Sequence, residues 1–226
     1  MVRIGSLELN KSIVAAIGKN PVESATRAKQ LGADILELRI DLLDEDEEVH
    51  ETLGSLKYTG LPVIITNRMK QEGGEWEKSE DERIDVLLSL MPLADAVDIE
   101  LCAKDRDMVV KEAKKSGKTL IISTHDFRKT PETGVMKGVL DESFAAGADI
   151  AKLAVMPGSF DDALRLLDVT LHAKSAVCTI AMGDIGKHSR VVAPIYGSVM
   201  TYGSVGTATA PGQLRVDELK KIFKLI

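Results

Sequence analysis

The stretch TLIISTHDFRKTPETGVMKGVLDESFAAGADIAKLAV, residues 119–155, contains one strand–helix–strand unit. The aliphatic runs at 120–123 and 150–155 predict two strands, and the amphipathic segment 136–146 predicts a helix that ends before Gly147. Both strands are nearly continuous in apolar residues, which is typical of parallel strands that are covered on both faces. Because a helix connects them, the two strands are expected to pair in parallel within one sheet.

The same alternation extends along the rest of the chain. The predicted strands comprise residues 13–17, 35–40, 63–66, 96–101, 120–123, 150–155, 176–181 and 198–202. The predicted helices comprise residues 22–31, 84–91, 108–115, 136–146 and 161–173. A set of eight strands favours a closed (β/α)8 TIM barrel of the α/β class over a doubly wound open sheet, which the periodicity alone also fits. The acidic run 44–48 is predicted to be the first turn of another helix, and residues 2–9 a hairpin that closes the bottom of the barrel.

Size and composition restrict the class of protein. The 226 residues, 44% of them hydrophobic, are enough for one sizeable core, so we predict a single domain over residues 1–226. A net charge of −6 argues against binding to nucleic acid or an anionic membrane and favours a small-molecule partner. Cys102 and Cys178 are expected to form no disulfide. The amino terminus does not resemble a signal peptide, and no run approaches the ~18 apolar residues of a membrane span, so a cytoplasmic location is expected.

Polar residues gather where the predicted strands end, which is where the active site of a parallel barrel lies. In the segment ELRID, the two-residue period of a strand places Glu37 and Arg39 on the inner face. The next two strands and a loop add Arg68, Glu72, Asp98 and Glu100. Charged groups inside a barrel must be paired or bound to a ligand, so these residues form either salt bridges or a binding site.

The unit at 119–155 carries the two most reactive side chains. His125 continues the inner face of the first strand, and Lys152 is the single lysine among apolar neighbours in IAKLAV. A buried lysine is rare because desolvation disfavours its charged form, and a neutral amine is a nucleophile. Taken alone, Lys152 is about equally well explained as a structural ion pair, and His125 is more simply a packing residue. Their joint occurrence on adjacent strands favours catalysis.

Together, Lys152 and His125 suggest dehydration chemistry. A lysine imine turns a ketone substrate into an electron sink, and a nearby histidine can then remove an α-proton and protonate a leaving hydroxyl. Guanidinium groups suit a substrate that carries a carboxylate and hydroxyls, and the candidates are Arg39, Arg68 and Arg190. The glycine-containing loops match no Walker or Rossmann fingerprint, and the histidines have no metal-ligand spacing. We therefore predict no metal, and the sequence does not require a nucleotide or a phosphorylated substrate.

Six motifs occur in the order that is found in one family. They are ELRID at 37–41, TNR at 66–68 followed by Glu72, STHDF at 123–127, AKLAVMP at 151–157, AMGDIGKHSR at 181–190 and TATAPGQ at 207–213. In these motifs the chain resembles the type I 3-dehydroquinate dehydratases essentially from end to end. Mild departures occur at Thr209, Tyr202 and Ala15, and the last of these puts one polar substrate contact in doubt.

The resemblance implies a role for each matching residue. Lys152 would form the Schiff base, His125 would be the general acid and base, and Glu72 would orient it. The residues that would bind or enclose the substrate are Glu37, Arg39 and Arg68 at its hydroxyls, Arg190 at its carboxylate, Gln213, Thr209 and Ala210 on a closing loop, and Met182 and Tyr202 in the wall. The implied reaction is a reversible syn dehydration of 3-dehydroquinate to 3-dehydroshikimate, without metal or cofactor, in a homodimer.

Two other functions compete with this interpretation. A class I aldolase shares the imine, but it predicts a phosphate site near the last two strands, for which residues 204–207 are the candidate. A binding protein that captures a hydroxy acid with its arginines would need no lysine. The joint presence of Lys152, His125 and Glu72 argues against the binding protein, and the arginines together with TATAPGQ argue against the aldolase.

Overall fold

The computed structural model describes residues 2–206 and 208–226, so Thr207, the first residue of TATAPGQ, lies outside the described part. The strands are β1 (Arg3–Ile4), β2 (Leu7–Glu8), β3 (Ser12–Ile17), β4 (Ile35–Arg39), β5 (Val63–Thr66), β6 (Ala96–Glu100), β7 (Thr119–Asp126), β8 (Ile150–Val155), β9 (Val177–Ala181), β10 (Met200–Ser204) and β11 (Leu214–Arg215). The α-helices are α1 (Pro21–Leu31), α2 (Val49–Leu56), α3 (Glu80–Leu90), α4 (Arg106–Lys115), α5 (Thr133–Ala145), α6 (Phe160–Leu171), α7 (Gly183–Gly186), α8 (Ser189–Ile195) and α9 (Val216–Phe223). Short 3-10 turns are η1 (Ile40–Leu42), η2 (Lys57–Thr59), η3 (Lys70–Glu72) and η4 (Met91–Leu93).

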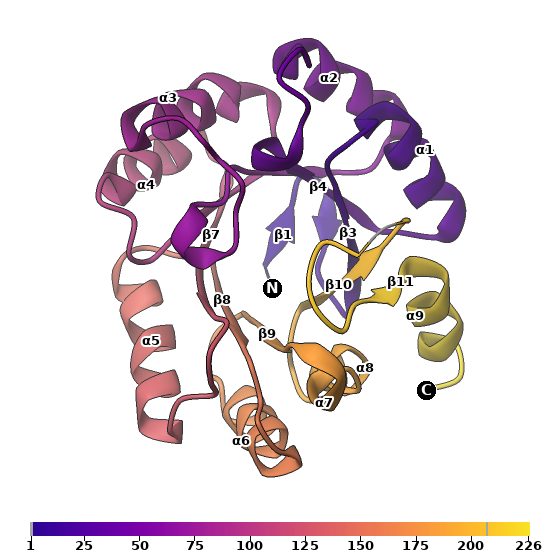
Figure 1. The fold of residues 1–226 in the computed structure, drawn as a ribbon, viewed down its shortest axis with the longest axis vertical. Helices are drawn as coiled ribbons and strands as arrows, with labels where there is room; N and C mark the ends of the chain where they lie inside the picture. The colour runs from indigo at the N-terminus through magenta and orange to yellow at the C-terminus, as the bar shows by residue number, and fades with distance from the viewer. Residues whose placement is uncertain (1, 207) are drawn as a thin grey trace.

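The large sheet is parallel and curls around one axis (Figure 1). Its nine strands follow the order β11-β10-β3-β4-β5-β6-β7-β8-β9, and a parallel bridge between Val177 and Ser198 joins the β9 side to the segment before β10. The first predicted strand (β3) therefore pairs with the last one (β10). A closed barrel requires this pairing, whereas an open doubly wound sheet does not. The α/β barrel that the sequence predicts is confirmed, and β11 is an addition that it does not predict.

Alternate residues of each strand pack into two separate cores, as the two-residue period requires. On β4, Ile35 points into the barrel, where it belongs to the same cluster as Ile64, Ile121 and Ile150. Leu36 and its even-numbered neighbours pack instead against the surrounding helices. The inner face is apolar at the bottom of the barrel and charged at the top, so the candidate site lies at the top, at the carboxyl ends of the strands.

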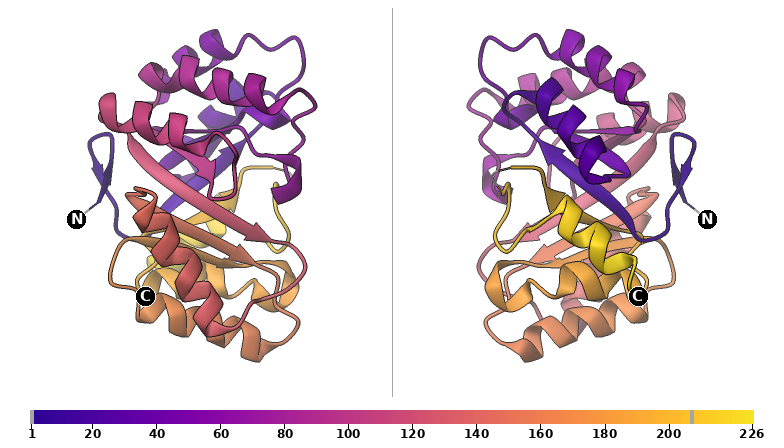
Figure 2. Two further views of the ribbon diagram at one scale, coloured as in Figure 1. Left: turned by 90° about the vertical axis from the view of Figure 1, so that its left-hand side faces the viewer. Right: turned by 90° about the vertical axis from the view of Figure 1, so that its right-hand side faces the viewer.

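The amino-terminal segment covers the bottom of the barrel. β1 and β2 pair as an antiparallel hairpin, and Figure 2 shows this hairpin against one end of the barrel. Its Ile4 and Leu9 are buried in the inner cluster, and the Thr119 hydroxyl donates to the Arg3 carbonyl at 2.6 Å. The predicted hairpin is confirmed, and it leaves the opposite end of the barrel for ligands.

Several boundaries differ from the predicted ones for identifiable reasons. α3 begins at Glu80, earlier than expected, because Ser79 and Glu82 form a capping box. β7 continues to Asp126, because Asp126 still pairs with Val155 of β8. The acidic run was expected to be the first turn of a helix and this is wrong: α2 starts at Val49, and Glu48 is its N-cap residue. Within the described residues, no helix combines the length and the hydropathy that crossing a membrane requires.

Candidate active site

A pocket opens at the carboxyl ends of the strands. It is lined by all twelve residues that the sequence predicts for the site: Glu37, Arg39, Arg68, Glu72, His125, Lys152, Met182, Arg190, Tyr202, Thr209, Ala210 and Gln213. Five further lining residues are Ala16, Gly73, Phe127, Ala154 and Ile180. Ala15, which we considered as a lost substrate contact, packs against the helix layer, so its neighbour Ala16 is the residue that faces the pocket.

Lys152 lies on β8 and is only 5% exposed. Its Nζ is 3.0 Å from Asp98 Oδ2 and 3.6 Å from Glu37 Oε1, and it lies 4.3 Å from the centroid of the Tyr202 ring. Along the chain the neighbours of Lys152 are apolar, but in space two carboxylates from other strands lie beside it. Burial disfavours ionisation of Asp98, yet Arg68 and Lys152 outweigh it and hold the pKa of Asp98 well below its usual range. A positive charge at Nζ is therefore stabilised from two sides.

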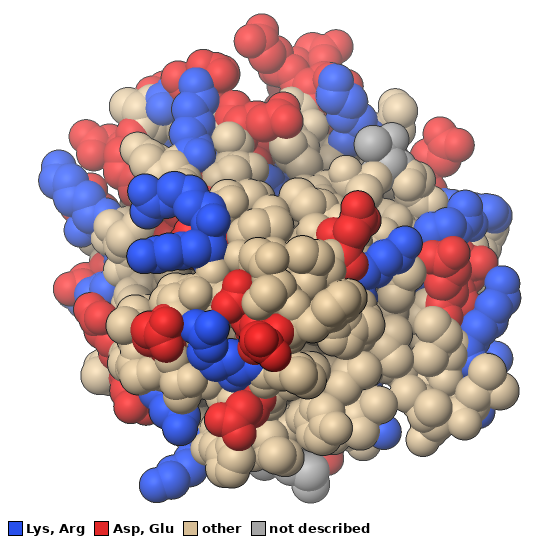
Figure 3. All heavy atoms as spheres, turned by 60° about the horizontal axis from the view of Figure 1, so that its bottom comes forward, with Lys and Arg blue, Asp and Glu red and all other residues tan. Residues whose placement is uncertain are grey.

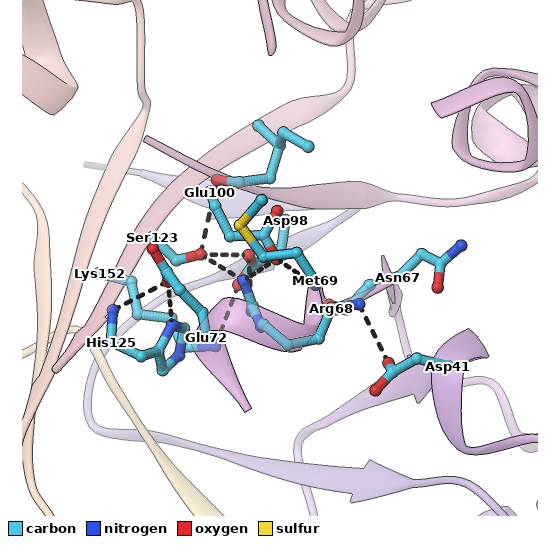
Figure 4. Close-up of polar contacts among 12 residues, drawn as sticks. Asp41, Asn67, Arg68, Met69, Glu72, Asp98, Glu100, Ser123, His125 and Lys152 are labelled. Atoms are coloured by element: carbon cyan, nitrogen blue, oxygen red, sulfur yellow. Dashed lines mark hydrogen bonds and ion pairs between the residues drawn. The ribbon is translucent and has the colours of Figure 1, made fainter. Parts of the chain in front are cut away.

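The Arg68 guanidinium is bound by protein carboxylates (Figure 4). It donates to Asp98 Oδ1 and to Glu100 Oε1 at 2.8 Å each, and to the Ser123 hydroxyl at 2.7 Å. Glu100 also lies 3.0 Å from the buried Arg83 of α3. The resemblance implies that Arg68 binds substrate hydroxyls, and these contacts also make it the centre of a buried network that holds Asp98, the partner of Lys152.

Glu72 ends the turn η3 and reaches His125 on β7. Its Oε2 lies 2.8 Å from His125 Nδ1 and accepts the backbone N–H of His125 at 2.9 Å. A carboxylate at Nδ1 favours the tautomer with a proton there, so that Nε2 offers its lone pair. The following turn is tight, since a Cβ atom at Gly74 would lie 1.9 Å from the Arg68 carbonyl oxygen. The structure brings Glu72 and His125 together as the sequence predicts.

Burial changes the proton affinity of both members of this pair. Desolvation raises the pKa of Glu72 to about 7, against the opposing charge of Arg68. Desolvation, together with the charges of Arg68 and Lys152, lowers the pKa of His125 well below its usual value. His125 is therefore neutral at neutral pH, which is the form that a general base requires.

Glu37 and Arg39 form the part of the wall contributed by β4. Glu37 Oε1 accepts the hydroxyls of Thr66 at 3.0 Å and of Tyr202 at 3.3 Å. Arg39 makes a bidentate pair with Asp41, at 2.9 and 2.7 Å. Burial and the nearby Glu37 raise the pKa of Tyr202 well above its usual value, so the phenol stays protonated and donates.

Arg190 on α8 contrasts with the other two arginines, because its partners are neutral. It is 1% exposed and donates to the carbonyls of Gly212 and Pro211 at 2.9 Å each and of Tyr202 at 3.4 Å. In the described part of the chain, no carboxylate lies within ion-pair distance of it. Desolvation lowers the pKa of Arg190 to about 10. A buried cation without a counter-charge is a receptor for an anion.

The loop that follows β10 carries the remaining predicted residues. Gln213 Oε1 accepts the backbone N–H of Thr209 at 2.8 Å, and Gln213 Nε2 donates to the Thr209 hydroxyl at 3.2 Å. Ala210 lies between them along the chain and lines the pocket, as does Met182, whose neighbour Gly183 donates to the Pro211 carbonyl of this loop. Arg190 donates to the carbonyls of Pro211 and Gly212, so two hydrogen bonds join the loop to the buried cation.

Fold and pocket together define a barrel enzyme that places a buried lysine and a histidine–carboxylate pair at the carboxyl ends of parallel strands. A family model for type I 3-dehydroquinase matches residues 12–226. The chain belongs to the type I 3-dehydroquinase family. Among the described residues, no group of three or more potential ligands is arranged to hold a metal ion.

Full-length relatives agree with this membership. The chain is 52% identical over 241 residues to the 3-dehydroquinate dehydratase of Methanosarcina barkeri and 50% identical over 233 residues to that of Methanococcoides burtonii, with complete coverage of both chains in each case. A crystal structure of type I 3-dehydroquinate dehydratase from Clostridium difficile with covalently modified comenic acid is similar at a TM-score of 0.90 and 33% identity. That similarity covers 99% of this chain and 96% of the other.

Proposed function

We propose that this chain, a type I 3-dehydroquinate dehydratase, catalyses its reaction through a Schiff base at Lys152. The enzyme is a hydro-lyase that removes water from 3-dehydroquinate to give 3-dehydroshikimate. The observation that carries the mechanism is the convergence of Lys152, His125 and Glu72 in one pocket. The covalently modified ligand in the Clostridium difficile relative supports covalent chemistry in the family.

In the proposed reaction, Lys152 attacks the substrate ketone as the neutral amine, and the ketone oxygen leaves as one water when the imine forms. Protonation of the imine makes it an electron sink, and Glu37 and Asp98 stabilise the resulting positive charge. His125 Nε2 then removes the α-proton, and the electron pair moves toward the iminium. The same imidazole returns the proton to the β-hydroxyl, which leaves as water, and a second water releases the conjugated enone from Lys152.

The substrate of this reaction carries a carboxylate, and the pocket charges indicate where that group binds. Arg39, Arg68 and Lys152 are each paired with protein carboxylates, whereas Arg190 donates to carbonyls. An incoming carboxylate therefore gains most at Arg190. On this assignment, substrate binding also fixes the loop at residues 211–212, and closure of the loop expels water that would hydrolyse the imine early.

Replacing Arg190 by alanine is expected to raise KM by roughly 30- to 150-fold, because a charged hydrogen bond to the carboxylate contributes about 2–3 kcal/mol. Arg190→Lys keeps the charge but loses the planar fork, so it should recover only part of the affinity. The measurement is steady-state kinetics. Arg128→Ala, which removes an exposed arginine, is the matched control. A KM equal to that of the wild type in Arg190→Ala would remove this residue from carboxylate binding.

The reaction itself is tested by incubating the purified chain with 3-dehydroquinate and following near-ultraviolet absorbance. The conjugated enone product absorbs there and the substrate does not. Enone formation without added metal or cofactor is the expected result. If no enone forms and a sugar phosphate is cleaved instead, the aldolase interpretation replaces this one.

The proposal further includes one catalytic domain, a cytoplasmic location and a homodimer. For the dimer, α6 and α8 lie side by side and expose large apolar side chains, namely Phe160, Leu164, Leu171 and Ile195. Figure 3 looks toward the bottom of Figure 1, where these helices lie, and shows a broad area without charged side chains. Exposed apolar surface of this kind is typical of protein interfaces, and sedimentation velocity of the purified chain tests the assembly.

A further inference from the structure

The two oxygens of the Glu72 carboxylate have different partners. Oε2 accepts both hydrogen bonds from His125, while Oε1 accepts the thiol of Cys102, with Sγ at 3.2 Å. Cys102 follows β6 and lies two residues beyond Glu100. Among the described residues, this thiol is the only donor recorded for Oε1. The orientation of the carboxylate therefore depends on a donor to Oε1, the oxygen that does not contact His125.

We propose that Cys102 is a positioning residue for the dehydration: its thiol holds Glu72 Oε1, which keeps Oε2 directed at His125 Nδ1 and favours the ionised carboxylate. Cys102 acts through Glu72 and touches no reacting atom. The inference rests on the proposed roles of Glu72 and His125, and it adds to them the residue that fixes the carboxylate.

The thiol is suited to this task because it stays protonated. Desolvation and the neighbouring Glu72 raise the pKa of Cys102 to about 12, so an S–H donor is present throughout the working range of the enzyme. The alternative acceptor is the thioether of Met69, with Sδ at 3.6 Å from Sγ. A carboxylate is the stronger acceptor and also the closer one, so the proton points at Glu72.

Burial and four neighbouring groups together set the pKa of the Glu72 carboxyl group. The pKa of Glu72 is raised to about 7, and desolvation is the largest cause; the charge of Glu100 acts in the same direction. Arg68, the Cys102 thiol and the His125 backbone N–H all lower this pKa. Removing the thiol hydrogen bond leaves the other influences in place. The pKa of Glu72 should then rise further, and the active ionised form should be lost at a higher pH.

The experiment compares Cys102→Ala, Cys102→Ser and Met69→Leu with the wild type. The wild-type profile of kcat/KM against pH should fall on the acid side near pH 7, as Glu72 becomes protonated. In Cys102→Ala this acid limb should move up by roughly 0.5–1 pH unit, and activity near neutral pH should fall about two- to fivefold and recover at higher pH. Cys102→Ser keeps a donor and should return the limb to its wild-type position or below it. Met69→Leu removes the alternative acceptor and should leave the profile unchanged.

The outcomes separate this inference from the function on which it rests. A uniform loss of activity in Cys102→Ala without a shifted limb would show a merely structural role and overturn the inference. A shift of equal size in Cys102→Ser would overturn it as well, because the donor would then be irrelevant. Borohydride trapping of the substrate at Lys152 should proceed in all variants; if the wild type itself formed no adduct and no enone, the proposed function would fall first, and this inference with it.

Discussion

Lys152→Ala is expected to reduce turnover by a factor of about 10⁴ or more and to abolish covalent capture of the substrate, since removing a nucleophile removes the whole covalent pathway. The pocket would still bind the substrate through Arg190 and the β4 wall, so the loss should appear in kcat rather than in KM. Lys152→Ala also leaves Asp98 and Glu37 buried without their shared cation. Because breaking a buried pair costs about 3–5 kcal/mol, this variant should also be less stable.

Lys152→Arg separates the chemical defect from this loss of stability. An arginine keeps the positive charge between Asp98 and Glu37, but its guanidinium forms no imine with a ketone under these conditions. Intact-protein mass after incubation with 3-dehydroquinate and borohydride should show one ligand attached per chain, intact or dehydrated, in the wild type and in Lys174→Ala, an exposed control. Neither Lys152 variant should show it. An adduct that persists in Lys152→Arg would mean that another amine forms the Schiff base.

The fold could be predicted because its determinants are local in sequence. Apolar strands and amphipathic helices alternate in the chain, and pairing of the first strand with the last one follows from their number. Inward positions such as Glu37, Arg39 and Lys152 follow from the two-residue period, which the separate inner and outer cores confirm. The boundaries depend on neighbours, as at the end of β7, where pairing with β8 extends the strand beyond the apolar run.

The pairing of charges could not be predicted, because it depends on the register between strands. Ser123 is aligned with Lys152 on one side and with Glu100 on the other, which brings Arg68 and Asp98 into the same layer as the lysine. A shift of one residue would turn these side chains into the helix layer. The sequence shows Asp98 and Glu100 as inner-face acids, but it does not show which cation each one meets.

Cys102 is the site residue that sequence reasoning overlooked most completely. The sequence predicts only that Cys102 forms no disulfide, and no spacing relates it to Glu72, thirty positions earlier. The two meet because the turn η3 folds back over the end of β6, where Glu100 accepts the backbone N–H of Met69 at 3.0 Å. Arg83 is a similar case. The sequence does not show that this helical arginine is buried, because its burial and its pairing with Glu100 depend on how α3 packs against the sheet.

His125→Ala should separate imine formation from proton transfer. Turnover is expected to fall by about 10³- to 10⁴-fold, because general acid and base catalysis by a positioned histidine contributes roughly 10²- to 10⁴-fold at each proton transfer. Lys152 and its carboxylate partners do not depend on the imidazole, since Asp98 and Glu37 hold Nζ directly. The variant should therefore still form the imine and stop before the α-proton leaves.

The mass of the trapped species tests this separation. Borohydride should trap an adduct of intact 3-dehydroquinate in His125→Ala, whereas the wild type should also yield an adduct lighter by one water. His172→Ala, which removes an exposed histidine, should behave like the wild type. If His125→Ala trapped the dehydrated adduct as readily as the wild type, another base would remove the α-proton, and Glu72 would then have to act on the substrate directly rather than through the imidazole.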